Sequence, residues 1–329
     1  MKKFINQVEL VEDQMIQGMV KAYPQYVRKL DCGNVVVRTE KKEGKVALIS
    51  GGGSGHEPAH GGYVGTGMLD AAVAGAVFTS PTPDQIYEGI KAIATDKGVL
   101  MVIKNYTGDV MNFEMAGEMA QMDEIKVAQV VVNDDVAVDG SLYTVGRRGV
   151  AGTVFVHKIA GAKAEEGAEL EEVQRVAQKV IDNVRTMGVA IRPCTVPAAG
   201  KPGFELGEDE MEVGIGIHGE PGTHKEPLRP ADEIVDHILD KILSDIDYTG
   251  HEVAVMVNSS GATPLMELFI INNHVADVLA AKGIRVYKTY VGEYMTSLEM
   301  EGFSVSLLRL DDELKALLDA HADTIAFKA

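Results

Sequence analysis

Short, continuous runs of β-branched and other apolar residues recur along the chain and indicate buried strands. The runs do not alternate with polar positions, which is typical of strands that are covered on both faces. Six runs have this character: Lys45–Ser50, Val99–Lys104, Val127–Val132, Val213–His218, Val253–Val257 and Ile284–Tyr290. We therefore expect sheets that carry helices on both faces.

Helical spacing of apolar residues fills stretches between these runs. The segment Leu170–Met187 carries an apolar stripe, and Gly188 follows it as a stop signal. A second helix is expected to begin at Pro230, and a third is expected over Pro264–Gly283. Strands that alternate with helices predict an α/β protein with mainly parallel or mixed sheets. In such folds a ligand binds at the carboxyl ends of the strands.

The length of 329 residues predicts about two domains. We place the boundary at the end of the Leu170–Met187 helix. The prediction is an N-terminal α/β domain over 1–187, which carries a glycine-rich segment, and a C-terminal α/β domain over 188–329. The segment Arg192–Gly203 is rich in proline and glycine, and it is expected to be a linker or a loop that enters the second domain.

Composition narrows the class of protein. The formal net charge of -18 argues against nucleic acid or an anionic membrane as the main partner, because both attract basic surfaces. Cys32 and Cys194 are far apart and form neither a disulfide framework nor a CxxC metal site. No stretch has the ~20 apolar residues of a membrane span, and the first residues do not resemble a signal peptide. We expect a cytoplasmic protein.

The sequence GGGSGHEPAHGG, Gly51–Gly62, directly follows the first predicted strand. Glycines allow backbone amides to approach a small ligand closely, so this segment is a candidate binding loop. It is neither a Walker loop, because no Lys-Ser or Lys-Thr follows, nor a GxGxxG fingerprint, because His56 or Pro58 occupies the last position. A tight glycine turn without a ligand is the alternative.

The residues from His56 to His60 match HExxH, the zinc-binding motif of metalloproteases. That motif requires a helix, on which residues four apart share one face. Pro58 inside the motif and the glycines on either side disfavour a helix. A zinc hydrolase that uses His56 and His60 is therefore a remote alternative.

Two further predicted strands end in residues that can carry chemistry. Lys104 ends one strand, and Asp109 follows in the next segment, where a carboxylate can take a proton from a substrate hydroxyl. On the sequence alone, an Asp109 that caps the following helix is slightly favoured. His218 ends another strand, and its neutral imidazole is a usable nucleophile or base. A histidine held by a backbone hydrogen bond is the alternative.

Together these segments resemble the dihydroxyacetone kinase family, specifically its dihydroxyacetone-binding subunit. The resemblance covers nearly the whole chain. It rests on six blocks: Gly51–Pro81, Val102–Phe113, Val132–Val138, Gly146–Ala162, Phe204–Gly222 and Asn258–Leu268. Blocks of this length make the resemblance specific.

The resemblance implies a homodimer of two-domain subunits that bind dihydroxyacetone. His218 would add through Nε2 to the ketone carbon and form a hemiaminal, which glycerol cannot do. Asp109 and His56 would act as base and hydrogen-bond partner of the hydroxyl that is phosphorylated. The implied substrate-binding residues are Gly53, Ser54, Gly55, His56, Lys104 and Asp109.

The resemblance also implies partners. We find no nucleotide-binding motif and no appended helical domain before Ala329, so the chain is expected to be the separate subunit of the phosphoenolpyruvate-dependent, phosphotransferase-linked system. A helical partner subunit would carry ADP/ATP with magnesium, a phosphotransferase-linked protein would rephosphorylate it, and no cofactor or metal would bind this chain. The chain alone would be inactive.

A non-enzymatic paralogue that binds dihydroxyacetone and acts as a transcriptional co-activator is the main alternative, because fold does not fix function. The presence of both His56 and Asp109 favours the kinase.

Overall fold

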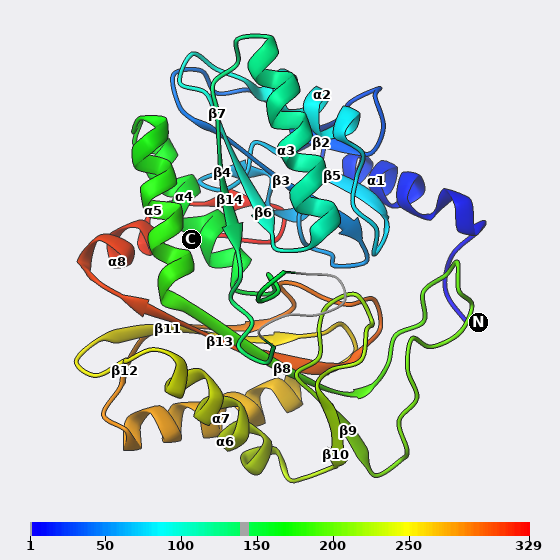
Figure 1. Ribbon diagram of the computed structural model, residues 1–329, viewed down its shortest axis with the longest axis vertical. Coiled ribbons are helices and arrows are strands. Elements are labelled where there is room, and N and C mark those ends of the chain that lie inside the picture. Colours follow the sequence, from blue (N-terminus) through cyan, green and yellow to red (C-terminus); the bar gives the residue numbers. More distant parts are fainter. Residues whose placement is uncertain (1, 139–144) are drawn as a thin grey trace.

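The computed structural model describes residues 2–138 and 145–329, and it contains two six-stranded sheets, one in each half of the molecule (Figure 1). In spatial order, the strands of the first sheet are β1 (Val27–Lys29), β2 (Val35–Arg38), β5 (Ala71–Val77), β3 (Ala47–Ser54), β6 (Val99–Lys104) and β7 (Val127–Val132). The four strands from β5 to β7 are parallel, and β1 and β2 are antiparallel additions at one edge.

The second sheet is mixed but mainly antiparallel. In spatial order, its strands are β10 (His224–Pro227), β9 (Glu210–Val213), β8 (Val184–Arg192), β13 (Glu301–Leu310), β11 (Glu252–Ser259) and β12 (Arg285–Gly292). β11 and β12 are parallel, whereas the four other neighbouring pairs are antiparallel. The predicted α/β fold with mainly parallel or mixed sheets is confirmed.

Helices form three layers around the two sheets (Figure 1). One layer covers the outer face of the first sheet and consists of α2 (Pro83–Ile93) and α3 (Thr107–Met122). The outer face of the second sheet is covered by α6 (Ala231–Asp245) and α7 (Leu265–Ala281). The central core, between the sheets, includes α4 (Thr153–Glu165), α5 (Leu170–Asn183) and α8 (Asp312–Asp319).

The remaining elements join the chain ends to the first half. α1 (Val11–Ala22), with the 3-10 turn Val8–Leu10 before it, contributes Ile16 to the central core. β4 (Gly65–Thr66) pairs with β14 (Asp323–Thr324), so the C-terminal segment returns to the N-terminal half. None of the helices in the described ranges combines the length and apolar character that a membrane span needs.

The residues of β3 explain why the predicted strands read as continuous apolar runs. Leu48 packs into the central core, whereas Ala47 and Ile49 pack against α2 and α3 on the other face. Because both faces of the strand are covered, apolar side chains are favoured at every position. The expectation of strands buried on both faces is confirmed here.

The predicted bounds are most in error for two elements. α5 ends at Asn183, and residues up to Met187 already belong to β8, in which Met187 and Gly188 pair with Val305 and Ser304 of β13. Pairing with a distant strand therefore overrides the local helical pattern. The predicted division between residues 187 and 188 falls inside β8.

The predicted strand Val213–His218 is also wrong. β9 ends at Val213, and Gly214 has φ +70, a left-handed conformation that takes the chain out of the strand. Residues 214–218 form an irregular segment, and β10 then pairs back along β9.

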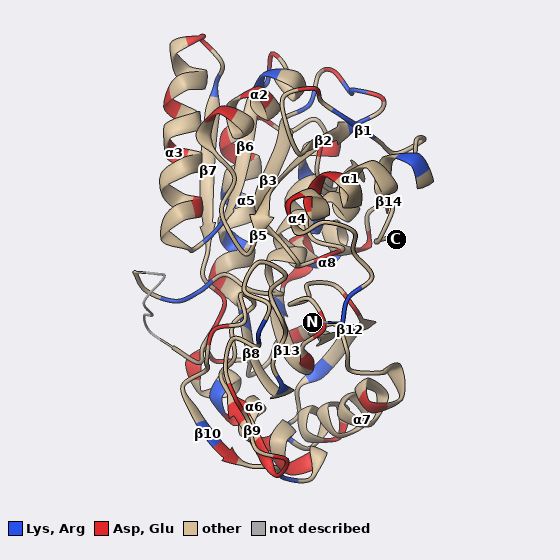
Figure 2. Ribbon diagram, turned by 90° about the vertical axis from the view of Figure 1, so that its right-hand side faces the viewer, with Lys and Arg blue, Asp and Glu red and all other residues tan. Residues whose placement is uncertain are grey.

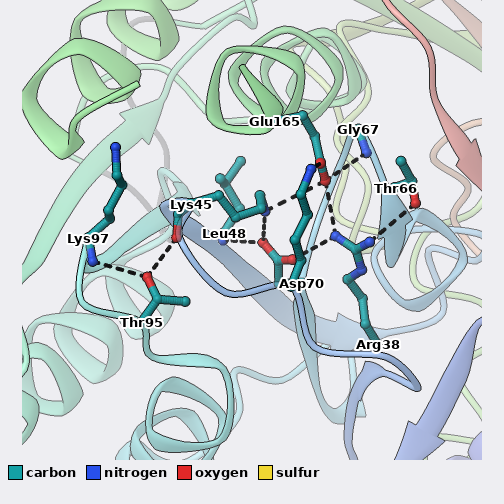
Figure 3. Close-up of polar contacts among 10 residues, drawn as sticks. Arg38, Lys45, Leu48, Thr66, Gly67, Asp70, Thr95, Lys97 and Glu165 are labelled. Carbon is teal, nitrogen blue, oxygen red and sulfur yellow. Dashed lines mark hydrogen bonds and ion pairs between the residues drawn. The ribbon is translucent and has the colours of Figure 1, made fainter. Parts of the chain in front are cut away.

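Charged residues of both signs are spread over both halves of the molecule (Figure 2). One group of them is largely buried in the first half and joins β2, β4 and α4 to the residues just before β3 and β5 (Figure 3). Arg38 Nη1, on β2, lies 3.0 Å from both Asp70 Oδ1 and Glu165 Oε1. Lys45 Nζ lies 2.5 Å from Asp70 Oδ2, and Arg38 Nη2 donates to Thr66 Oγ1 at 3.2 Å. We call Arg38, Lys45, Asp70 and Glu165 the ion-pair network.

Candidate functional site

The glycine-rich segment begins as a strand and not as a loop. β3 continues through Ser54, and Gly51, Gly52 and Gly53 pair with β5. A Cβ at Gly52, where φ is +152, would lie 2.3 Å from Lys104 Nζ, and a Cβ at Gly53 would lie 2.5 Å from the Thr79 nitrogen. Side chains cannot fit there, so glycine allows the Lys104 ammonium to reach the strand backbone.

The segment that follows is a series of turns, with a 3-10 turn at Gly61–Tyr63, so the HExxH residues do not form a helix. His56 Nδ1 lies 2.9 Å from the carbonyl oxygen of Thr296, whereas His60 faces Lys104 and His157. Within residues 2–138 and 145–329, no group of three or more His, Cys, Asp or Glu side chains is placed to hold a metal ion. The helical arrangement that a zinc hydrolase requires is not formed.

Contacts with the second half of the chain fix the position of His56. Gly55 O accepts a hydrogen bond from the Leu298 N–H at 2.8 Å, and His56 O accepts one from the Thr296 N–H at 3.2 Å. The His56 ring stacks on Phe78, with ring centroids 5.3 Å apart. Residues distant in sequence therefore hold this ring in place.

Lys104 and Asp109 meet under the glycine strand, where both are buried. Lys104 ends β6 as predicted, and its Nζ lies 3.1 Å from Gly51 O and 3.3 Å from Asp109 Oδ2. Asp109 is the third residue of α3, and its Oδ1 accepts a hydrogen bond from Ser80 Oγ at 2.5 Å. The prediction that Asp109 caps the helix is wrong, because Tyr106 is the N-cap residue and the carboxylate faces Lys104 and Ser80.

His218 stands beside His56, on the irregular segment after β9. The two ring centroids are 4.8 Å apart and the rings are nearly perpendicular, at 82°. Tyr106 and Phe78 pack edge-on against the His218 ring, with centroid distances of 4.3 Å and 5.6 Å. The alternative in which a backbone hydrogen bond holds the His218 ring lacks support, since the contacts of this ring with the described residues are with the rings of His56, Phe78 and Tyr106.

A buried arginine orients the His218 segment. The backbone N–H of His218 donates to Glu220 Oε2 at 2.8 Å, and Glu220 Oε1 lies 3.4 Å from Arg148 Nη1. Arg148 also donates to Asp135 Oδ2 at 2.7 Å and to the carbonyl oxygen of Gly214 at 2.7 Å. Sequence reasoning missed Asp135, Arg148 and Glu220, although charged residues inside otherwise apolar blocks were a signal.

Both site histidines are neutral. Burial, reinforced by the Lys104 ammonium, lowers the pKa of His56 to about 3. Burial, followed by the influence of His56 and Lys104, holds the pKa of His218 well below its usual range. Neutral imidazoles keep a lone pair for nucleophilic or base chemistry. His56 Nε2 is buried without a hydrogen-bond partner among the described residues, so it is available to a ligand.

Two of the predicted binding residues in the glycine segment already use their hydrogen-bond donors within the protein. Ser54 Oγ donates to Gly75 O at 2.7 Å, and the Gly55 N–H lies 3.1 Å from both carboxylate oxygens of Glu57. These two groups are thus engaged within the protein. The structure brings the Gly53 backbone, Lys104, Asp109, His56 and His218 into one region where the two halves meet.

Comparisons with known proteins identify the family of this chain. The family model described as the Dak1 domain matches residues 17–326. The chain is 56% identical to PTS-dependent dihydroxyacetone kinase 1, dihydroxyacetone-binding subunit DhaK, of Listeria innocua, over 99% of this chain and 100% of that protein.

Two solved structures are also similar. The dihydroxyacetone kinase of C. freundii matches with a TM-score of 0.93 at 35% identity, over 99% of this chain and 60% of that one. The dihydroxyacetone kinase operon co-activator Dha-DhaQ matches with a TM-score of 0.89 at 37% identity, over 95% of this chain and 97% of that one.

Proposed function

The chain belongs to the Dak1 domain family, and from this premise we propose that it is the dihydroxyacetone-binding subunit of a phosphoenolpyruvate-dependent dihydroxyacetone kinase. The observation that carries the proposal is the pair of neutral histidines, 4.8 Å apart, beside the buried Lys104–Asp109 pair. A nucleophile, a base and a fixed cation are the groups needed to capture a ketone and activate its hydroxyl.

His218 is the proposed nucleophile. Its Nε2 lone pair forms a bond to the ketone carbon, the carbonyl π electrons move to oxygen, and the imidazole proton is transferred to that oxygen. The product is a neutral hemiaminal. A ligand as small as dihydroxyacetone gains at most ~1.5 kcal/mol per heavy atom from contacts, so a reversible covalent bond supplements binding. It also excludes glycerol, which has no carbonyl group.

Asp109 and His56 are the proposed groups that act on the hydroxyl to be phosphorylated. Asp109 accepts the hydroxyl proton as the oxygen attacks the phosphoryl group, and His56 Nε2 hydrogen-bonds the same hydroxyl. Lys104 holds the carboxylate in place. Phosphoryl transfer depends mainly on positioning and charge stabilisation, which these fixed, buried groups supply.

The donor side of the reaction is assigned to partners. ADP/ATP and magnesium are carried by a helical partner subunit, and a phosphotransferase-linked protein rephosphorylates the nucleotide, with phosphoenolpyruvate as ultimate donor. This chain is proposed to be a cytoplasmic homodimer that is active only with these partners. Its 56% identity to a subunit named for such a system supports this assignment over a single-chain kinase.

A co-activator role is the second candidate, because the match to Dha-DhaQ extends over 97% of that chain. His56 and Asp109 distinguish the two functions, since a protein that only senses dihydroxyacetone needs no base. Turnover with a competent, nucleotide-loaded partner subunit identifies the kinase. Dihydroxyacetone binding without any turnover identifies the co-activator.

The experiment that tests the site is carbon NMR of the purified chain with carbonyl-labelled dihydroxyacetone. We expect the carbonyl signal to move from the ketone range to the tetrahedral range. The tetrahedral signal should be lost in His218→Ala. It should be kept in the matched control His224→Ala, because His224 is exposed on β10. A ketone signal that persists with saturating protein would remove His218 from its role.

A further inference from the structure

A chain of buried polar contacts leads from the proposed base, Asp109, through Lys104 and His60 to His157. Asp109 Oδ2 contacts Lys104 Nζ at 3.3 Å, Lys104 Nζ contacts His60 Nε2 at 3.2 Å, and His60 Nδ1 contacts His157 Nε2 at 3.0 Å. The four residues are 0–5% exposed, so solvent does not substitute for any of these contacts.

The hydrogens of Lys104 are all engaged within the protein. An ammonium group has three N–H donors and no acceptor. Lys104 has three acceptors within 3.3 Å, namely Gly51 O, Asp109 Oδ2 and His60 Nε2. His60 is the third acceptor, and without it one N–H of a buried cation would have no partner.

This arrangement fixes the tautomers of both histidines. Because His60 Nε2 accepts from Lys104, the ring proton of a neutral His60 is on Nδ1. That proton is donated to His157 Nε2, and Ser50 Oγ, 3.5 Å from His60 Nδ1, cannot donate to it because it donates to Val102 O at 2.7 Å. His157 then carries its own proton on Nδ1, which has no partner among the described residues.

Both rings stay neutral in this setting. Burial, followed by the charge of Lys104, lowers the pKa of His157 to about 3 and holds the pKa of His60 well below its usual range. A neutral His60 can accept a hydrogen bond from a cation, whereas a protonated one cannot.

A packing role alone does not account for the two rings. The residues around them, which include Ala59, Tyr63 and Val154, belong to the central apolar core, and apolar side chains would fill the same space. The His157 N–H is instead buried without a partner, which is costly. What the pair provides in return is an acceptor of fixed tautomer for Lys104.

We propose that His60 and His157 are positioning residues, which hold the Lys104 ammonium against Asp109 so that the carboxylate keeps the orientation needed to take the substrate proton. The inference rests on the proposed function. Neither ring touches substrate in this scheme, and His157 acts only through the tautomer of His60.

The first test compares His60→Leu with His60→Gln in the chain assayed together with its nucleotide-loaded partner subunit. Leucine removes the acceptor, and kcat should fall about 10- to 100-fold with KM for dihydroxyacetone within a few-fold, because one hydrogen bond to a charged group is lost. Glutamine places an amide oxygen near the position of Nε2 and should restore kcat to within about five-fold of wild type. Equal losses in both variants would overturn the proposal.

Tyr63→Phe is the matched control for loosened packing. Its ring lies in the same core, 6.2 Å from the His157 ring. Its hydroxyl donates to the Tyr294 carbonyl oxygen and not to Lys104, His60 or His157. We expect its kcat to equal that of wild type. A loss as large as that of His60→Leu would mean that the histidines act through general packing, and would also overturn the proposal.

The second test does not depend on turnover or on any variant folding. Nitrogen NMR of the wild-type chain with labelled histidine reports the tautomer and protonation of each ring. We expect His60 and His157 to remain neutral, with the proton on Nδ1, from pH 8 to about 5. If either ring titrates in this range, or if His60 carries its proton on Nε2, the proposed positioning role of the two histidines is wrong, even where the kinase assay succeeds. If both rings have the expected tautomers but the chain shows no turnover with its partner, the arrangement of the histidines is correct and the proposed kinase function is wrong.

Discussion

Two buried lysine–carboxylate pairs in the first half of the molecule have different surroundings. In the ion-pair network, Asp70 Oδ2 accepts from both Lys45 Nζ at 2.5 Å and the Leu48 N–H at 2.8 Å, and its Oδ1 accepts from Arg38 (Figure 3). In the candidate site, Lys104 lies 3.3 Å from Asp109 and shares its hydrogens with a histidine ring and a backbone carbonyl.

The difference lies in how completely the hydrogen-bonding atoms of each group are paired. Opposite charges and a backbone N–H surround Asp70, and none of the unpartnered buried side-chain atoms in the described part of the chain belongs to the network. In the candidate site, His56 Nε2 is buried without a partner among the described residues. A saturated network stabilises the fold, whereas polar atoms kept unsatisfied in a buried region mark a site that a ligand completes.

The largest expected effect separates the two carboxylates by activity. Asp109→Asn keeps the shape of the side chain and removes the base, so kcat with the partner subunit should fall about 10²- to 10⁴-fold. Asp70→Asn, assayed in the same way per folded molecule, should keep kcat within a few-fold, because Asp70 touches no residue of the candidate site. Similar kcat losses in the two variants would break the comparison.

The free energy of unfolding should depend more on the ion-pair network than on the candidate site, the reverse of the effect on kcat. Asp70→Ala leaves Arg38 and Lys45 with too few opposite charges, and we expect the free energy of unfolding to fall by about 3–5 kcal/mol. Asp13→Ala is the control, because solvent reaches both side chains of the Asp13–Lys29 pair, which should contribute less than about 1 kcal/mol. Urea denaturation measures both. A loss below about 1 kcal/mol in Asp70→Ala would show that the network contributes little to stability.

As pH falls, the stability contributed by the buried neutral His157 should be lost before the stability contributed by the ion-pair network. The pKa of His157 is about 3 in the folded chain and near 6.5 when unfolded, so below pH 6.5 the unfolded chain binds the extra proton. The stability is complete above pH 6.5 and falls as pH decreases towards 3, by up to about 1.4 kcal/mol per unit for this ring.

Glu165, in the ion-pair network, differs from His157 because its contribution to stability is lost only at a lower pH. Burial opposes its ionisation, but Lys42, Lys45 and Arg38 outweigh burial and lower the pKa of Glu165 below its ordinary value of 4.5, so its contribution is lost only below that pH. Unfolding measured from pH 7 to 5 should be less pH-dependent in His157→Leu than in wild type, by about one proton. Equal slopes would mean that His157 is protonated in the folded chain.

The sequence predicted those parts of the fold that depend on local pattern. The strands Val99–Lys104 and Val127–Val132 have the predicted bounds. The first is buried along its whole length, so its apolar run is continuous, whereas the second is a partly buried edge strand. β13 was not predicted, since Ser304 and Ser306 interrupt its apolar residues. Residues up to Met187 were assigned to a helix, because only pairing with β13 makes them a strand.

The candidate site divides in the same way. Lys104 and His218 were found because each follows or ends a recognisable apolar run, and Asp109 because it lies close behind Lys104. The contact between Lys104 and His60 joins residues 44 positions apart, and that between Arg148 and Glu220 joins residues 72 apart. Such contacts leave no periodic trace in the chain, so the residues that support the site could be found only in three dimensions.

The smallest expected effects come from two hydroxyl groups, one at the edge of each region. Thr66 Oγ1 accepts from Arg38 in the network, and Ser80 Oγ donates to Asp109 in the site. Each bond involves a charged group in a partly buried position, so its loss should cost about 1 kcal/mol. In Thr66→Val we expect that cost in the free energy of unfolding, with kcat unchanged.

In Ser80→Ala the lost hydrogen bond should instead destabilise the transition state, because the Asp109 carboxylate is held less firmly. We expect kcat to fall about five-fold. If Ser80→Ala lowered stability but left kcat unchanged, Asp109 would be held by Lys104 alone, and the orienting role would belong entirely to the lysine and the histidines behind it.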